Sequence, residues 1–301
     1  MITNQEVSRL IHRLRFAFKL QDILDVLHFS KGTYEYWEGR LNRQDRDAEL
    51  VTLIRQIRKE NNDYGYRRVT GALRAQGVIA NKKRVQRIMA KLGMQVKTFV
   101  PSQTDTYHSY RGTIGKVSRN RLRRHFRTSV CHQKIVTDTS ELTYLVRQAD
   151  GCWQKHGLFL DAFMDLYNSE IIAYRISDHP NEQAILDGLN EAIQKTNDCP
   201  YRRTFHSDQG GDYQEKQYCQ LLKHHRIFQS MSRKGNCFDN AVIENFFSLL
   251  KREMYYGRDF RNYGTLKEAI EQYIDYYNCR RIKEKLGWRS PVAYRESTQR
   301  R

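Results

Sequence analysis

The sequence predicts an α/β protein in which a mixed β-sheet with helices follows an all-helical region. Up to about residue 97, apolar residues recur at helical spacing. From about residue 131, strand-like segments rich in β-branched and aromatic residues alternate with helical ones. Three antiparallel-looking strands followed by a βαβα pattern indicate one layer of mixed sheet. The length of 301 residues is sufficient for two domains with a sizeable core.

The first segment, residues 1–60, is expected to be a helical region resembling a helix-turn-helix. Leu20, Ile23 and Leu24 repeat at helical spacing, and a short turn at 28–32 leads into a second helix. Residues 1–63 carry 11 basic and 10 acidic side chains. Because binding to phosphates would need a basic excess, the balance favours a packing or dimerisation unit.

Residues 61–97 predict a second helix pair with a basic face. Val69 and Leu73 share one face of the first helix, which Gly77 ends, and Asn81 is a suitable N-cap for a helix that Gly93 ends. An apolar stripe on the second helix leaves its cations on the exposed side, as a recognition helix in a major groove requires. The alternative is a basic helix that only packs. These candidate DNA-binding cations are Lys82, Lys83, Arg84, Arg87 and Lys91.

The positive charge is concentrated in one part of the chain. Residues 64–130 contain 16 basic side chains and one acid, and so supply +15 of the net charge of +18. This pattern predicts a nucleic-acid-binding segment rather than a generally solvated surface. Within it, residues 98–130 read as a basic linker that follows the phosphate backbone. Further candidate DNA contacts are Arg121, Arg123, Arg124, Arg233, Lys234 and Lys251.

The segment 131–260 supplies the predicted sheet. KIVTDTS, ELTYLVR, LFLDAFMDLY and EIIAYRIS read as strands, with a hairpin at Asn168-Ser169. A helix (EQAILDGLNEAIQK), a strand (RTFHS), a helix (YQEKQYCQLLKHH), a strand (IFQS) and a long helix (DNAVIENFFSLLKREM) follow. Residues 261–301 add one amphipathic helix and a basic tail. Cys131-His132 has no second ligand pair at zinc-finger spacing, so zinc has little support.

Three acidic residues lie where these elements end or begin. Asp138 is in the first strand, Asp208 follows the strand RTFHS, and Glu244 is early in the long helix. Carboxylates from three elements can converge at one sheet edge and bind Mg²⁺, which prefers hard oxygen ligands. A chance triplet, and an exposed Glu-Lys helix surface, are the plain alternatives. Asn240, Glu244, Ser248 and Lys251 are expected on one polar helix face.

Three segments resemble the DDE transposases of bacterial insertion sequences, namely HSDQGGDY, SMSRKGNCFDNAVIENFFSLLKREM and YYNCRRIKEKLGWRSPVAY. Among these transposases, the chain resembles the second-frame (OrfB) type, whose core is similar to retroviral integrase and ribonuclease H. The upstream DYGYRRVTGAL and NKKRVQRIMAKLGM resemble the helix-turn-helix that precedes this core. The 35 residues between Asp208 and Glu244 are the most specific part of the match. This chain has Ile135 where the family usually has a Trp, three residues before Asp138.

The resemblance implies a ribonuclease-H-like core in which Asp138, Asp208 and Glu244 bind two Mg²⁺ or Mn²⁺ ions. It implies a transposase that cuts DNA and transfers strands at insertion-sequence ends. Two alternatives are a ribonuclease-H-like nuclease without strand transfer and a DNA-binding regulator with an inactive core. The expected partners are double-stranded DNA at element ends and target, further copies of the chain, and the element's first-frame protein. With no apolar run near the roughly 20 residues of a spanning helix, no membrane is expected, and the location is cytoplasmic, at the bacterial nucleoid.

Overall fold

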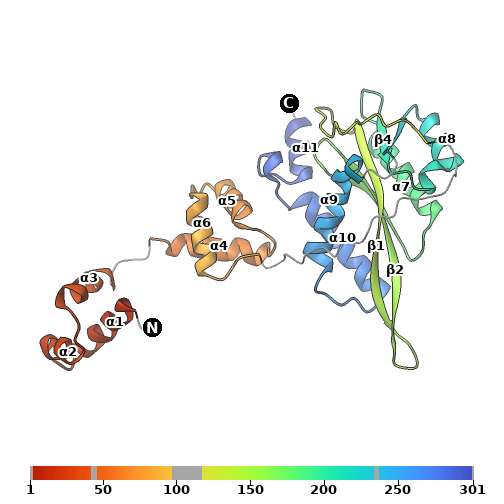
Figure 1. Ribbon diagram of the computed structural model, residues 1–301. Coiled ribbons are helices and arrows are strands. Elements are labelled where there is room, and N and C mark those ends of the chain that lie inside the picture. The colour runs from red at the N-terminus through yellow and green to blue at the C-terminus, as the bar shows by residue number, and fades with distance from the viewer. Residues whose placement is uncertain (1–2, 42–45, 97–116, 234–236, 300–301) are drawn as a thin grey trace. The chain divides into compact units, whose positions relative to one another are not determined.

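The computed structural model describes residues 3–41, 46–96, 117–233 and 237–299 (Figure 1). The chain divides into two compact units, residues 1–60 and 61–301. The first unit contains the helices α1 (Asn4–Leu14), α2 (Leu20–Val26), α3 (Lys31–Leu41) and α4 (Ala48–Glu60). α1 packs on α2 and α3 around Ile11, Ile23, Leu24 and Tyr34, so the predicted helical spacing is confirmed.

The second unit begins with the predicted basic helix pair. It consists of α5 (Tyr66–Ala75) and α6 (Lys82–Lys91), which pack together. The Asn81 side chain accepts a hydrogen bond from the Lys83 backbone N–H at 2.9 Å, as the N-cap prediction requires. Gly77 and Gly93 both have positive φ angles where the helices end, a conformation that glycine adopts without strain. Val85, Ile88 and Met89 are buried as predicted.

A five-stranded sheet with the order β3-β2-β1-β4-β5 forms the centre of this unit. The strands are β1 (Lys134–Arg147), β2 (Trp153–Asp165), β3 (Ile171–Ser177), β4 (Thr204–Ser207) and β5 (Phe228–Met231). β1, β2 and β3 are antiparallel, whereas β4 and β5 run parallel to β1. This mixed topology is the ribonuclease-H-like arrangement expected from the sequence. One 14-residue strand replaces the two short ones that KIVTDTS and ELTYLVR suggested.

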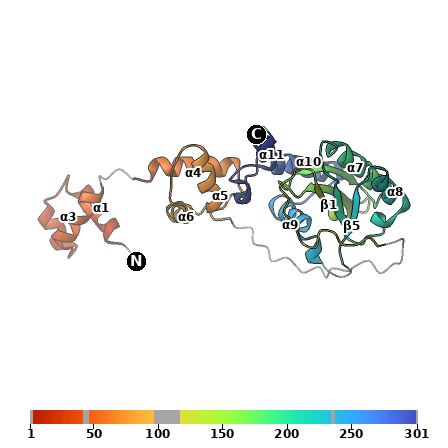
Figure 2. The ribbon, with the colours of Figure 1, turned by 90° about the horizontal axis from the view of Figure 1, so that it is seen from above.

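Helices cover both faces of the sheet (Figures 1 and 2). One face packs on α7 (Glu182–Lys195) and α8 (Lys216–His224), and the other on α9 (Ala241–Leu250) and α10 (Tyr263–Cys279). Val136 and Ile135, which are adjacent in β1, belong to different cores, as strand alternation requires. Ile135, at the position of the family's usual Trp, is fully buried.

The long helix predicted from Asp239 to Met254 is interrupted. A 3₁₀ turn at Cys237–Asp239 precedes α9, and a π-helical turn at Lys251–Tyr255 follows it. The Tyr255 hydroxyl donates to the Thr143 carbonyl oxygen at 2.8 Å and accepts from the Thr143 N–H at 3.1 Å, which fastens this turn to β1. A 3₁₀ turn at Glu284–Leu286 and the final helix α11 (Pro291–Gln299) complete the chain.

The described part of the predicted basic linker, residues 117–130, packs on the core. Leu122 is buried, the Ser118 hydroxyl donates to Gln229 at 3.0 Å, and the Arg121 N–H donates to Ser230 at 2.8 Å. This anchoring could not be predicted from the sequence, because a single leucine among many cations has no periodicity. Residues 98–116 of the same predicted linker lie outside the described residues.

Candidate active site

Two neighbouring parallel strands bring Asp138 and Asp208 to the same edge of the sheet. In the register of β1 with β4, Val136 lies opposite His206. Asp138 and Asp208 each come two residues later, and side chains two residues apart in a strand share a face. Val136 packs in the core that contains α9, so Asp138 is on the α9 side of the sheet. The two carboxylates therefore face the same layer.

Glu244 reaches this edge from the first turn of α9. Ile243 and Phe247 are buried in the same core as Val136 and hold the helix against β1. At the start of the helix, the Asn240 side-chain amide donates to the Thr137 carbonyl oxygen at 3.3 Å. This bond ties the N-terminus of α9 to the residue before Asp138. Asn240 is thus buried between helix and strand rather than on the exposed polar face that the sequence predicted.

A buried histidine fixes the distance between β4 and α9. His206 Nε2 donates to the Asp239 carbonyl oxygen at 3.0 Å, which leaves Nδ1 to accept from the Ser230 hydroxyl at 2.8 Å. Burial lowers the pKa of His206 to about 4, so the ring is neutral at pH 7. His206, which lies two residues before Asp208, thus connects β4 with β5 and with the turn that precedes α9.

Asp239 closes the loop that leads into α9. Its carboxylate is fully buried and accepts from Arg233 Nε at 2.9 Å, Arg124 Nε at 2.9 Å and the Asn120 amide at 2.9 Å. Hydrogen bonds from Arg233 hold the pKa of Asp239 far below its usual range. Asp239 is therefore a positioning residue for the loop, a role that the sequence motif alone did not reveal.

The three candidate carboxylates act on one another electrostatically. Burial, and then the charges of Asp208 and Glu244, raise the pKa of Asp138 well above its usual value. Burial and Asp208 also raise the pKa of Glu244. Burial raises the pKa of Asp208, although its Oδ1 accepts a hydrogen bond from the Gly210 N–H at 2.9 Å. Such mutual repulsion between half-buried carboxylates arises where like charges converge, and it marks functional sites more often than structural ones.

The donor set fits a hard divalent cation. All three side chains offer oxygen, and no thiol or imidazole among the described residues belongs to the cluster. Mg²⁺ and Mn²⁺ prefer such ligands, and a bound cation would relieve the repulsion that adds to burial in raising the pKa values of Asp138 and Glu244. The residues present therefore suit the ion type that the sequence suggested.

The other acids near the first motif lie elsewhere. Asp161 is opposite Thr139 in the β1–β2 register and accepts from its hydroxyl, so it points to the α7–α8 face. Burial raises the pKa of Asp161 to about 6. Asp165 accepts backbone hydrogen bonds from His132 and Tyr167 at the far end of β2, and Asp150 is exposed in a turn. Of these four aspartates, strand alternation thus favours Asp138.

A second group of metal-type side chains lies at that far end of β2. Ligand atoms of Cys131, His132 and Asp165 lie within 4.8 Å of one another. Both Asp165 oxygens already accept backbone hydrogen bonds, and His132 Nδ1 contacts Asp198 at 2.6 Å. Burial raises the pKa of the Cys131 thiol, which opposes the thiolate that zinc would need. These contacts explain the group as one that stabilises the fold rather than as a metal site.

The candidate DNA-binding cations fall into two sets. On α6, Lys82, Lys83, Arg87 and Lys91 are exposed and Arg84 is half-buried. Near the core, Arg121 lies 4.0 Å from the Phe228 ring centroid and Arg123 is exposed, while Arg124 and Arg233 bind Asp239. Lys251 begins the π-helical turn, and Lys234 lies outside the described residues.

Comparisons with known proteins agree with this architecture. An HTH-like domain model matches residues 44–99, and integrase core domain models match residues 133–237 and 244–298. A putative transposase of the insertion sequence IS150 from Escherichia coli K12 is 38% identical over 96% of this chain and 98% of its own length. A transposase of IS3A from the same strain is 30% identical, over 90% of this chain and 92% of its own length.

A structural comparison finds the integrase catalytic core domain of HTLV-2, solved with magnesium, at 10% identity and a TM-score of 0.41. It covers 55% of this chain and 97% of that one. Within the described residues, no helix is both long and apolar enough to cross a membrane. Coverage of at least 90% of both chains by relatives that are 30% and 38% identical shows the family. This chain belongs to the DDE transposases of bacterial insertion sequences, with a helix-turn-helix region preceding an integrase core.

Proposed function

We propose that this chain cuts DNA at the ends of an insertion sequence and joins the freed 3′ ends to target DNA. The observation that supports the proposal is that Asp138 and Asp208 follow paired positions of β1 and β4, with the charges of Asp208 and Glu244 close enough to raise the pKa of Asp138. Together these carboxylates would hold two Mg²⁺ or Mn²⁺ ions. Such ions activate the attacking oxygen and stabilise the leaving oxygen of a phosphodiester.

The chain's own residues divide the remaining work. Asn240 and His206 hold α9 and β4 so that Glu244 and Asp208 face Asp138. The exposed cations of residues 61–97, those that follow in residues 98–130 and Lys251 bind the phosphate backbone of the element ends and target. Joining two ends to one target favours an assembly of several copies on DNA. The first-frame protein of the element is a further proposed partner.

The carboxylates are tested by isosteric variants of the full chain. Asp138→Asn, Asp208→Asn and Glu244→Gln keep side-chain shape but remove one negative charge each. We expect end cleavage and strand transfer on labelled DNA to fall by several orders of magnitude in each variant, because each loses an anionic ion ligand. Binding to duplex DNA should remain near the wild-type level, since it depends on other residues.

Asp150→Asn, which removes an exposed carboxylate in a turn, is the matched control and should keep full joining activity. Near-normal joining by any triad variant would remove that residue from the site. Nicking without joining by the wild-type chain would instead indicate a nuclease. DNA binding with no chemistry in Mg²⁺ or Mn²⁺ would indicate a regulator. Replacing Mg²⁺ with Ca²⁺ should retain binding with little cleavage, because Ca²⁺ coordinates more loosely.

A further inference from the structure

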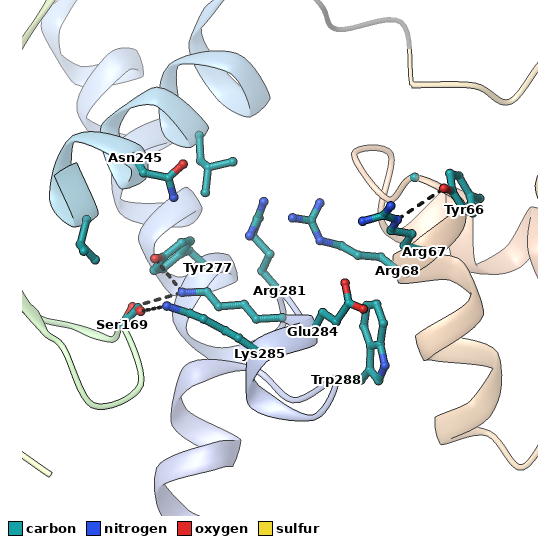
Figure 3. Close-up of a pocket in the computed structure, with 14 residues that line it drawn as sticks. Tyr66, Arg67, Arg68, Ser169, Asn245, Tyr277, Arg281, Glu284, Lys285 and Trp288 are labelled. Atoms are coloured by element: carbon teal, nitrogen blue, oxygen red, sulfur yellow. Dashed lines mark hydrogen bonds between the residues drawn. The ribbon is translucent and has the colours of Figure 1, made fainter. Parts of the chain in front are cut away.

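A cavity with several cations in its wall, away from the carboxylates, lies between the start of α5 and the C-terminal part of the core. Its volume is about 550 Å³. Figure 3 shows Arg67 and Arg68 approaching it from α5, opposite Arg281 and Lys285. Lys283 completes a set of five cations in its wall, and Glu284 is the acid among its lining residues. Such an excess of positive charge needs either internal carboxylates or an anion from outside.

Two of the five cations have internal partners. Arg281 is buried and donates to both oxygens of Glu253, at 2.8 and 2.6 Å. Arg68 lies 3.8 Å from Asp63 and 3.9 Å from Glu253. The nearby Tyr64 hydroxyl donates to the Arg280 carbonyl oxygen at 3.0 Å. These contacts hold α5 against the core. They also pair Asp63 and Glu253, the two acidic groups behind the cavity, with arginines.

The two lysines donate hydrogen bonds to neutral groups among the described residues. Lys283 Nζ donates to the Tyr277 hydroxyl at 2.7 Å and to the Ser169 carbonyl oxygen at 3.3 Å. Lys285 Nζ donates to the Ser169 hydroxyl at 2.6 Å. Burial, and then nearby cations, lower the pKa values of both ammonium groups. An anion in the cavity would remove this repulsion.

The start of α5 adds a further preference for an anion. Its N-cap, Gly65, has no side chain to accept a hydrogen bond from the first turn, and that turn contains no acidic residue. Gly65, Tyr66, Arg67 and Arg68 all line the cavity. Free N–H groups and the positive end of the helix therefore lie on the same side as Arg67, which is exposed at the cavity mouth.

The cavity is separate from the proposed catalytic edge. Val242, Asn245 and Leu249 of α9 line it. On a helix with 3.6 residues per turn, Val242 and Leu249 project more than about 120° away from Glu244. A group bound here is therefore on another side of α9 from the carboxylates and cannot be the phosphate that reacts there.

We propose that this cavity binds one backbone phosphate of the element-end DNA, so that a single phosphate contacts both the helix-turn-helix and the core. This inference rests on the proposed function. Arg67 and the α5 N-terminus contact the phosphate from one side, and Lys285 and Lys283 from the other. In a helix-turn-helix the helix before the recognition helix crosses the backbone, which is the place that α5 has before α6. Binding of this phosphate by both parts sets the distance along the DNA between the sequence that the helix-turn-helix recognises and the bond that reaches the catalytic edge.

The test uses the full-length chain and a labelled duplex carrying the element's end, with affinity measured by fluorescence anisotropy from 50 to 200 mM salt. Arg67→Gln and Lys285→Gln each replace one cation of the cavity with a neutral side chain, and each should weaken binding about fivefold at 150 mM salt. Because both contact the same phosphate, the double variant should lower the log–log salt slope by only about 0.9 rather than 1.8. Lys223→Gln, on α8 across the sheet, is the matched control and should bind like the wild type.

A second measurement locates the phosphate. Neutral methylphosphonates are introduced one at a time along the duplex. One position should weaken binding to the wild type but not to the double variant. Wild-type affinity and slope in both single variants, with joining still lost in Asp208→Asn, would overturn this proposal and leave the function standing. Thermal stabilisation by inorganic phosphate that Lys285→Gln abolishes, with unchanged DNA binding, would show a free-anion site and overturn the assignment to DNA.

Discussion

At the scale of single residues, the start of α9 depends on one buried carboxylate. Asp239 accepts hydrogen bonds from two arginines and an asparagine that lie on two separate segments of the chain. Its backbone carbonyl oxygen accepts from His206 on β4. The next residue, Asn240, is bonded to β1. Asp239 thus determines where α9, and with it Glu244, begins relative to the sheet.

We expect Asp239→Asn to lower the free energy of unfolding by about 2 kcal/mol at pH 7, because the variant loses charge-assisted hydrogen bonds. The pKa of Asp239 is lowered in the folded chain relative to its ordinary value of 3.8. Its stabilising contribution is therefore complete above that value and declines as the pH falls below it. Urea unfolding at pH 7, 5 and 3.5 should show the wild-type advantage shrinking only at the lowest pH. An advantage that is constant over this range would contradict the ion pairing.

Sequence patterns pointed to the candidate triad, whereas they did not point to the residues that position it. Asp208 and Glu244 lie in motif text with a fixed interval, and their charges raise the pKa of Asp138, but the triad itself stays a prediction. His206 and Asp239 have no such signal, because their roles arise from hydrogen bonds to segments distant in sequence. The pairing of Arg124 and Arg233 with Asp239 was missed for the same reason.

At the scale of elements, local rules predicted the helices well where an apolar stripe and a cap coincide. α6 has both, and its predicted N-cap and buried stripe are confirmed. At the end of α9 the apolar stripe continues to the buried Met254 and no stop signal follows Leu250, so the sequence predicted that the α-helix goes on through KREMY. Its π-helical turn follows from the tertiary bonds of Tyr255 to Thr143. Such a change of helix type depends on packing and cannot be derived from propensity.

The packing of α5 on the C-terminal segment predicts an asymmetric response of two helical glycines. A Cβ added at Gly71 would lie 2.5 Å from ring atoms of Trp288, whereas at Gly39 in α3 it would meet nothing within 4 Å. Gly71→Ala should therefore cost about 1–3 kcal/mol, and Gly39→Ala should stabilise its helix by up to about 1 kcal/mol. Hydrogen exchange of α5 and α3 measures the two effects separately.

The indole itself can be tested in the same series. Trp288→Leu should offset part of the Gly71→Ala cost, with a coupling of more than about 0.5 kcal/mol in the double-mutant cycle. Additive effects would mean that Gly71 and Trp288 do not share a contact, and α5 would then not be held against the core as described.

At the scale of the whole chain, the excess of positive charge and the candidate carboxylates lie in different parts of the sequence. Residues 64–130 hold +15 of the net charge, whereas residues 131–301, which contain the carboxylates, carry only +2. The sequence predicted this division and the ribonuclease-H-like sheet correctly. It did not predict that residues 117–130 pack on the core, because that contact depends on β5.

The charge distribution makes the last prediction specific to a region. Affinity of the full chain for duplex DNA should fall steeply with salt, by about 0.9 log units per log unit of salt for each phosphate contacted. Replacing Lys82 and Lys83 of α6 with alanine should make this slope shallower by about 1.8 if each lysine binds one phosphate. Replacing Lys216 and Lys223 of α8 removes the same charge from the region of low net charge and should leave the slope unchanged. Strand transfer by the α6 double variant should recover at saturating DNA, because the carboxylates are intact. Equal losses in the two double variants would mean that binding follows total charge, and that residues 61–97 are not the DNA-binding unit.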